Sequence, residues 1–426
     1  MLNVLGVIIA FIIIILLIRK RFNFGLSLIL GSLILGLFSL QTIDLIDIPK
    51  ALIQAVIYSF EDQKFDFETI ELAFLMTLIY ILAKSMQETG AIQKLITSLR
   101  NFFSKGGTLG VIPAIYGLMP VPGGALFSAP LIDKEGDKFG LTTNQKNFLN
   151  VWFRHIWFPI YPISSAMILV CSTEFSNIDI YQLIIVDFPA FIAFIGIGLV
   201  FLKFFIRNTH KSKAKTEKNY GGLMYILPPI LPILLYLGFF LVGLPNLRYL
   251  QKTIFIGGVI LSIIVLFFLL KIDWRKYVDI LKKSISFNLA LAIFGIMIFR
   301  EMFKVSEANL IIADVIGNLP FPALIIIIII PLVLGVLTGY NLGAIALSYF
   351  LVEPFFEFTG INIIGLTSII FVSSLSGYLI SPIHLCNVVS SEYLKTDTTR
   401  MYKMYIPAVL SLLTVQTLIV IFFMRL

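Results

Sequence analysis

Residues 117–128 read Gly117-Leu-Met-Pro-Val-Pro-Gly-Gly-Ala-Leu-Phe-Ser128, and they lie inside an apolar stretch that extends from 108 to 132. Two prolines and two glycines within five residues cannot continue a regular helix, because proline lacks a backbone donor and glycine disfavours helix. The stretch therefore predicts two half-helices joined by an unwound tip. The second half-helix would begin near Gly124.

A second apolar stretch, 321–352, is too long for one membrane span and too short for two. It contains Thr338-Gly-Tyr-Asn-Leu-Gly343, and a new helix would begin within this motif, near Leu342. We expect both stretches to be re-entrant hairpins. The positive end of each new helix would favour an anion at the tip, whereas the exposed tip carbonyls could instead ligate Na⁺.

The composition places the chain in a bilayer. Hydrophobic residues make up 58% and charged residues 13% of the 426 positions, and the mean hydropathy is +0.98. Soluble domains carry roughly 25% charged residues. The net charge of +8 indicates no nucleic-acid partner, because the basic residues lie in short loops between apolar runs. We predict an all-α polytopic membrane protein whose surroundings are lipid.

The loop charges predict its orientation. Ten spans are expected, near 2–18, 23–40, 69–86, 147–171, 181–206, 223–243, 253–270, 285–303, 361–394 and 402–424. If both hairpins are re-entrant, one side of the membrane receives 25 of the 32 Lys and Arg residues. The positive-inside rule makes that side cytoplasmic. Both termini would then be extracytoplasmic in a prokaryotic cell membrane, with the first hairpin entering from inside and the second from outside.

The order of elements in 1–206 recurs in 220–426, and the basic segment 207–219 is expected to be a cytoplasmic linker. Each half carries a hairpin (108–132; 321–352) followed by a broken helix (147–171; 361–394). Because each half has five crossings, the second copy must be inverted. Two inverted repeats with interrupted helices are the architecture of many secondary transporters.

The tips and breaks supply the candidate substrate site near the middle of the membrane. Prolines in both broken helices free backbone carbonyls, and hydroxyl and amide side chains follow them. Those polar groups could satisfy the freed backbone or bind a solute. The candidate site residues are Pro120, Pro122, Gly123, Gly124, Ser128, Tyr161, Ser164, Ser165, Thr338, Gly339, Tyr340, Asn341, Gly343, Ser381, His384 and Asn387.

Ionisable residues inside spans are costly and therefore suggest function. Arg154, with His155, is a candidate counter-charge for an anion, or Arg154 snorkels to the cytoplasmic surface. His384 could relay a proton, donate to the solute or cap freed carbonyls. Asp187 offers a cation or proton role. Both cysteines, Cys171 and Cys386, are expected to be inert core thiols.

Three motifs carry a resemblance to known proteins: the hairpin 119–130, Trp152-Phe-Arg-His-Ile-Trp157 and Ser381-Pro-Ile-His-Leu-Cys386. They resemble an uncharacterised prokaryotic integral-membrane family, a domain of unknown function, which we place in the ion transporter superfamily. The stretch Ala83-Lys-Ser-Met-Gln-Glu-Thr-Gly90 is similar to one in gluconate permeases. The resemblance implies an elevator-type transporter, usually a homodimer, that moves organic anions with Na⁺ or H⁺. The Ser-Asn-Thr tip motif of sodium–dicarboxylate carriers is absent from both hairpins.

The sequence therefore predicts a secondary active transporter for a small organic anion such as a carboxylate, working by symport with H⁺ or Na⁺. A channel is an alternative, which saturable uptake against a gradient would exclude. An intramembrane enzyme is a further alternative, but the chain has no His-Glu-x-x-His motif, no Gly-x-Ser-x-Gly elbow and no P-loop. We expect no enzyme activity, no cofactor and no bound metal other than Na⁺ at the hairpin tips.

Overall fold

The computed structural model describes residues 2–99, 106–118, 123–206, 220–243, 245–308, 310, 311, 314 and 321–425. Nearly all regular structure in these ranges is helical. The two short strands β1 (Tyr58–Ser59) and β2 (Lys64–Phe65) form one antiparallel pair. The predicted linker 207–219 and the tip residues Pro120 and Pro122 lie outside the described residues.

Eight helical segments of the described chain are long and apolar enough to span a membrane. They coincide with eight of the ten predicted spans. Of the other two, 23–40 contains the 15-residue helix α2 (Phe24–Phe38), and 147–171 is divided into three short helices. The chain is therefore an all-α, multi-pass membrane protein, as its composition predicted.

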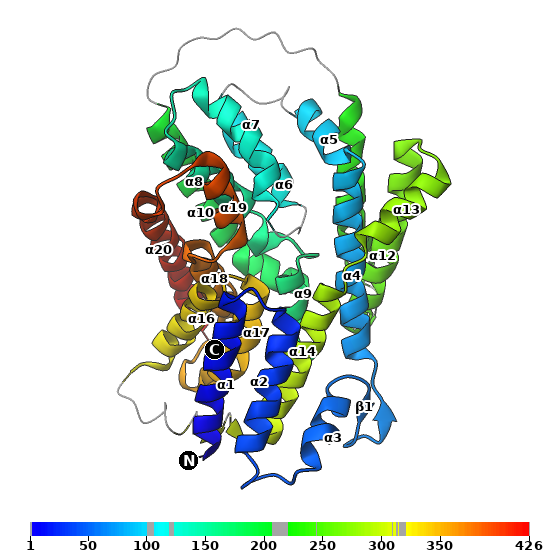
Figure 1. The fold of residues 1–426 in the computed structure, drawn as a ribbon, viewed down its shortest axis with the longest axis vertical. Coiled ribbons are helices and arrows are strands. Elements are labelled where there is room, and N and C mark those ends of the chain that lie inside the picture. The colour runs from blue at the N-terminus through cyan, green and yellow to red at the C-terminus, as the bar shows by residue number, and fades with distance from the viewer. Residues whose placement is uncertain are drawn as a thin grey trace.

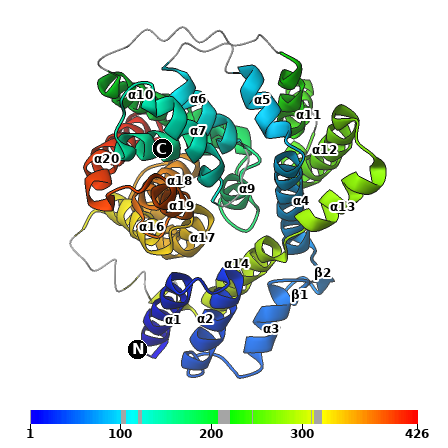
Figure 2. The same cartoon turned by 45° about the horizontal axis from the view of Figure 1, so that its top comes forward.

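The helices pack as two groups (Figure 2). One, which we call the flanking group, contains α2 and the following elements: α1 (Leu2–Arg19), α3 (Asp47–Gln54), α4 (Glu68–Glu88), α5 (Ala91–Leu99), η2 (Gly221–Ile226), α11 (Leu227–Val242), α12 (Leu247–Leu270), α13 (Trp274–Ser284) and α14 (Phe287–Val305). Its members come from the first part of each predicted repeat.

The other, which we call the hairpin group, contains the later elements of each predicted repeat. These are α6 (Thr108–Gly117), α7 (Ala125–Asp137), α8 (Thr143–Arg154), η1 (Phe158–Ile160), α9 (Ser165–Cys171), α10 (Ile180–Phe205), α16 (Ala323–Thr338), α17 (Asn341–Val352), η3 (Glu353–Phe358), α18 (Ile363–Ile380), α19 (Leu385–Leu394) and α20 (Thr398–Phe423). In Figure 1, α6 and α7 lie in the upper half of the molecule, whereas α16 and α17 lie lower.

The α18–α19 segment is the centre of the hairpin group. In the most apolar stretch of this segment 83% of the residues are buried, whereas in α1 and α12 the share is 28%. The serines of α18 fit this position, because small side chains let neighbouring helices approach closely. Helices such as α12, by contrast, keep apolar residues on their outer faces, which suits contact with lipid.

Glycines set the closest helix contacts in both hairpins. A Cβ atom on Gly117 would lie 2.0 Å from the Arg154 carbonyl oxygen, at the end of α8. In the second hairpin, a Cβ added to Gly335 would lie 2.5 Å from the Ser374 carbonyl oxygen of α18. One added to Gly377 would lie 2.0 Å from the Leu332 carbonyl oxygen of α16. The first helix of each hairpin therefore lies directly against the helix that precedes the break.

We predict that Gly377→Ala destabilises the protein by about 1–3 kcal/mol, because the added methyl group has no room between α16 and α18. Thermal unfolding in detergent would measure this as a lower midpoint. Gly238→Ala is the matched control, since nothing lies within 4 Å of its added Cβ and alanine favours helix. Equal midpoints for the two variants would contradict the packing described here.

Candidate functional site

The two hairpin tips meet at the gap between α18 and α19. Gly123 and Gly339 adopt left-handed backbone conformations, with φ of +69° and +59°. A Cβ added to Gly123 would lie 3.4 Å from the Leu385 side chain. One added to Gly339 would lie 3.1 Å from the backbone nitrogen of His384. Both positions need glycine, because a side chain would be strained and Gly339 has no space for one.

The breaks in the two long segments hold these tips in place. Ser164 caps α9, since its hydroxyl accepts a hydrogen bond from the Met167 N–H at 3.2 Å. Ser381, in the gap after α18, donates to the Val336 carbonyl at 2.7 Å. The Ser381 bond ties the second hairpin to the break. These two predicted site residues therefore satisfy backbone groups. Ser164 also lines a cavity between the tips and the breaks.

A cavity of about 290 Å³ lies where the tips and breaks meet. Nine of the predicted site and counter-charge residues line it, namely Gly123, Arg154, His155, Tyr161, Ser164, Ser165, Gly339, Tyr340 and Asn341. Asn341 is only 3% exposed, yet neither its amide oxygen nor its amide nitrogen has a hydrogen-bond partner among the described residues. The Tyr161 hydroxyl also lacks one. Buried polar atoms without partners are unusual and suggest that a ligand supplies them.

Arg154 brings positive charge to the cavity. Its side chain is 4% exposed, and Nη1 donates to the Tyr116 carbonyl at 2.8 Å. A Cβ on Gly124 would lie 2.1 Å from Nη2, so the guanidinium lies against the start of α7. This buried position does not fit the snorkelling alternative. Together with the N-terminal ends of α7 and α17, the guanidinium makes the cavity wall electropositive.

His155, Tyr378 and His384 form a ring cluster beside the cavity. The His155 and His384 centroids are 4.9 Å apart, and those of Tyr378 and His384 are 3.9 Å apart. His384 is completely buried, and apart from the neighbouring Cys386 thiol no described residue offers its ring nitrogens a hydrogen bond. Cys386, predicted to be an inert thiol, lies next to both histidines. Sequence reasoning did not assign Tyr378 or Cys386 to the site.

Four other predicted residues do not line the cavity and have structural contacts instead. Ser128 donates to the Asn150 amide oxygen at 2.5 Å, and Asn387 accepts from the Asn147 amide at 3.0 Å. The Thr338 hydroxyl donates to the Leu334 carbonyl at 2.7 Å, within its own helix. Gly343 accommodates the ring of Phe24, which would lie 2.7 Å from an added Cβ.

The sequence interpretation missed Asn147 and Asn150, which join both halves of the chain. Asn150 donates to the Ala125 carbonyl of α7 at 3.0 Å and to the Ser390 hydroxyl of α19 at 2.8 Å. Both asparagines lie on one face of α8, three residues apart. That spacing in an apolar segment was the available signal.

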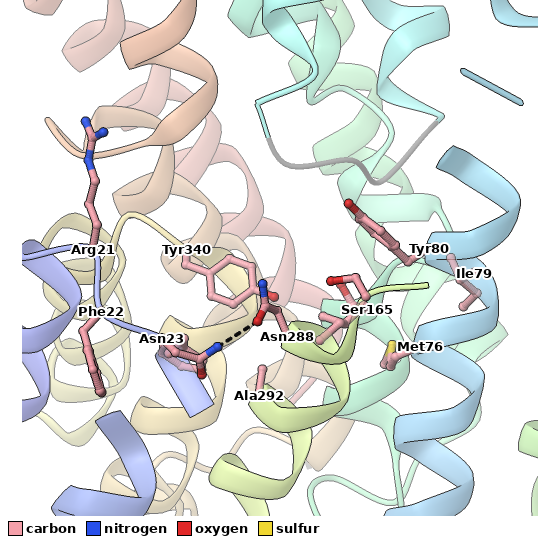
Figure 3. A pocket seen from close by; sticks show the side chains of 13 residues that line it. Arg21, Phe22, Asn23, Met76, Ile79, Tyr80, Ser165, Asn288, Ala292 and Tyr340 are labelled. Carbon is pink, nitrogen blue, oxygen red and sulfur yellow. Dashed lines mark hydrogen bonds between the residues drawn. The ribbon is translucent and has the colours of Figure 1, made fainter. Parts of the chain in front are cut away.

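A second cavity of about 480 Å³ opens between the flanking group and the tips (Figure 3). Asn23 and Asn288 face each other across its edge and are joined by a hydrogen bond of 3.0 Å. The larger cavity shares three lining residues with the smaller one, namely Phe24, Ser165 and Tyr340. The two cavities are therefore neighbours, and the larger one lies at the boundary between the groups.

The fold and the site define a multi-pass helical membrane protein in which two hairpin tips lie beside a cavity with unpartnered polar atoms. Residues 1–422 match the model of the family described as Protein of unknown function (DUF401), and the chain belongs to this family. No curated protein matches the chain. Membership of the ion transporter superfamily and the similarity to gluconate permeases stay predictions from the motifs.

We predict that Asn150→Ala loosens the first hairpin, because the Ser128 and Ser390 hydroxyls and the Ala125 carbonyl each lose a partner. A buried group left without its hydrogen-bond partner, here chiefly the Ser390 hydroxyl, costs about 1–3 kcal/mol. Ser128 keeps its bond to the Ala125 carbonyl at 3.2 Å. Hydrogen–deuterium exchange should rise in α7 and α19. Thr97→Ala is the control, since its exposed hydroxyl bonds only within α5. Unchanged exchange in α7 would show that the asparagine does not hold the hairpin.

Proposed function

We propose that this protein is a secondary active transporter for a small organic anion in the cytoplasmic membrane of a prokaryotic cell. The observation that carries the proposal is the meeting of two hairpin tips at a helix break, around a buried cavity with unpartnered polar atoms. Unwound backbone at membrane depth is characteristic of solute sites in secondary transporters.

The two groups of helices support an elevator-type mechanism. The cavity is lined almost entirely by the hairpin group, and the flanking group contributes only Ile18 and Phe24. The hairpin group could therefore carry the solute along the flanking group as a rigid body. In this proposal the flanking group is the scaffold, and two chains dimerise through it. The inverted repeat would provide the matching inward-facing and outward-facing states.

The charge of the cavity favours an anion. Arg154 and the start of α7 provide positive potential at one wall, and α17 begins with Asn341 at the other. The Asn341 amide offers a donor and an acceptor to the solute. Ligand cavities for small molecules begin at about 300 Å³, so a volume of about 290 Å³ suits a small carboxylate.

Asp187 is the candidate for coupling to H⁺ or Na⁺. Its side chain is fully buried in α10, where Oδ1 accepts from the Ser368 hydroxyl at 2.6 Å and from the Gln416 amide at 3.4 Å. Among the described residues Oδ2 has no partner. A carboxyl inside a membrane needs a proton or a cation to neutralise it when its partners are neutral. This carboxyl joins α10, α18 and α20 within the hairpin group.

We predict that Arg154→Gln and Asn341→Ala each abolish saturable uptake of the anion, because each removes a group that faces the cavity. The first measurement is a thermal-shift screen of the purified protein against carboxylates, with and without Na⁺, followed by uptake into proteoliposomes. Arg248→Gln is the control, since Arg248 is exposed at the start of α12. Normal uptake in both site variants would reject the site, and flux without saturation would favour the channel.

We predict that Asp187→Asn uncouples transport. An amide has the shape of the carboxyl but cannot carry a proton or balance a cation. The variant should exchange labelled solute across the membrane, yet fail to accumulate it against a gradient when a proton or Na⁺ gradient is imposed. Gradient-driven accumulation equal to that of the natural protein would exclude Asp187 from coupling.

A further inference from the structure

Three soft or borderline ligand atoms gather at one wall of the cavity. A ring nitrogen of His155, a ring nitrogen of His384 and the thiol sulfur of Cys386 all lie within 4.8 Å of one another, and all three residues are buried. His155 comes from the end of α8, and the other two from the start of α19. Both breaks, more than 200 residues apart in sequence, thus contribute to a single cluster.

The hydrogen bonds orient His155 as a ligand. Its Nδ1 lies 2.6 Å from the Val151 carbonyl, and a carbonyl can only accept, so Nδ1 carries the hydrogen. Nε2 therefore presents a lone pair, which accepts from the Tyr378 hydroxyl at 3.3 Å. Metal-binding histidines in proteins are commonly fixed in this way, by donation from the other ring nitrogen to a backbone carbonyl.

His384 and Cys386 complete the ligand set. Among the described residues, Cys386 itself is the neighbour that approaches a ring nitrogen of His384, so the ring is available to an ion that the two residues share. A Cys386 thiolate would supply negative charge that offsets the guanidinium of Arg154, which lines the same cavity. Thiolate and imidazole ligands favour a softer cation over a hard one. His155 and Cys386 line the cavity, so a fourth coordination position would face it.

We propose that His155, His384 and Cys386 bind a divalent ion of the Zn²⁺ class. On binding, the Cys386 thiol gives its proton to solvent, and the Tyr378 hydroxyl gives up its hydrogen bond to His155 Nε2. The Cys386 sulfur, His155 Nε2 and one ring nitrogen of His384 then form the bonds to the metal. Three protein ligands leave one position open, as in sites where zinc takes up water or a substrate group. A carboxylate solute is the group that the cavity would place there, and only this last step rests on the proposed function.

The test uses Co²⁺ as a probe of the purified full-length protein in detergent. We expect one Co²⁺ per chain, with a thiolate-to-metal charge-transfer band that Zn²⁺ removes by competition. Cys386→Ser should abolish the band and lower Co²⁺ affinity by at least about 100-fold. Removing a residue that only hydrogen-bonds a ligand already lowers metal affinity by about 10–100-fold, and removing a ligand itself should lower it more. Cys171→Ser is the matched control, since Cys171 is the chain's other cysteine and is also buried.

His155→Gln provides a second variant that keeps both thiols, in case Cys386→Ser does not fold. It should also lower Co²⁺ affinity by at least about 100-fold, with an unchanged elution profile. Absence of a charge-transfer band in the natural protein, or its loss in Cys171→Ser alone, would overturn the proposal. In those cases the three side chains only pack together. Because the readout is metal binding, failure here would leave anion transport unaffected.

Discussion

The membrane interior offers no water to backbone N–H and C=O groups, and this constraint governs the hairpin group. Each interruption of a helix exposes such groups, so it must be covered by protein or line a water-filled cavity. Here the tips at Gly123 and Gly339 lie against the segment between α18 and α19. Ser381, at one break, donates to the Val336 carbonyl in the last turn of α16, and Ser164, at the other, caps α9. The four irregular segments gather at one place because each helps to bury another, and their meeting point encloses the cavity.

Side-chain amides connect the halves of the chain around that cavity. Asn147 and Asn150 on α8 reach α19, which belongs to the other predicted repeat, and Asn150 also holds α7. Inside an apolar bundle, such bonds specify one arrangement of helices, since any other would leave the amides without partners. The site is thus held by a rigid polar network, while Asn341 and Tyr161 keep polar atoms available.

The boundary between the two groups has a different character. Ring contacts and linked polar groups cross it. Tyr181 stacks on Tyr236 at 5.3 Å, and the Tyr236 hydroxyl donates to Asp179 at 2.6 Å. An Arg300–Glu174 ion pair joins α14 to the segment after α9. The larger cavity of Figure 3 also lies on this boundary. A site carried by one group, beside the boundary with the other, is compatible with movement of the groups relative to each other.

The sequence alone determined the membrane class, eight of the spans and the positions of the interruptions, because hydropathy and the helix-breaking power of proline and glycine are local properties. It also indicated Arg154 and Asn341, since polar residues in apolar segments are conspicuous. It could not show that Ser128 and Asn387 contact asparagines of α8, nor that Cys386 lies beside two histidines. Those relations join residues from separate helices, and only the packing of the helices decides which side chains meet.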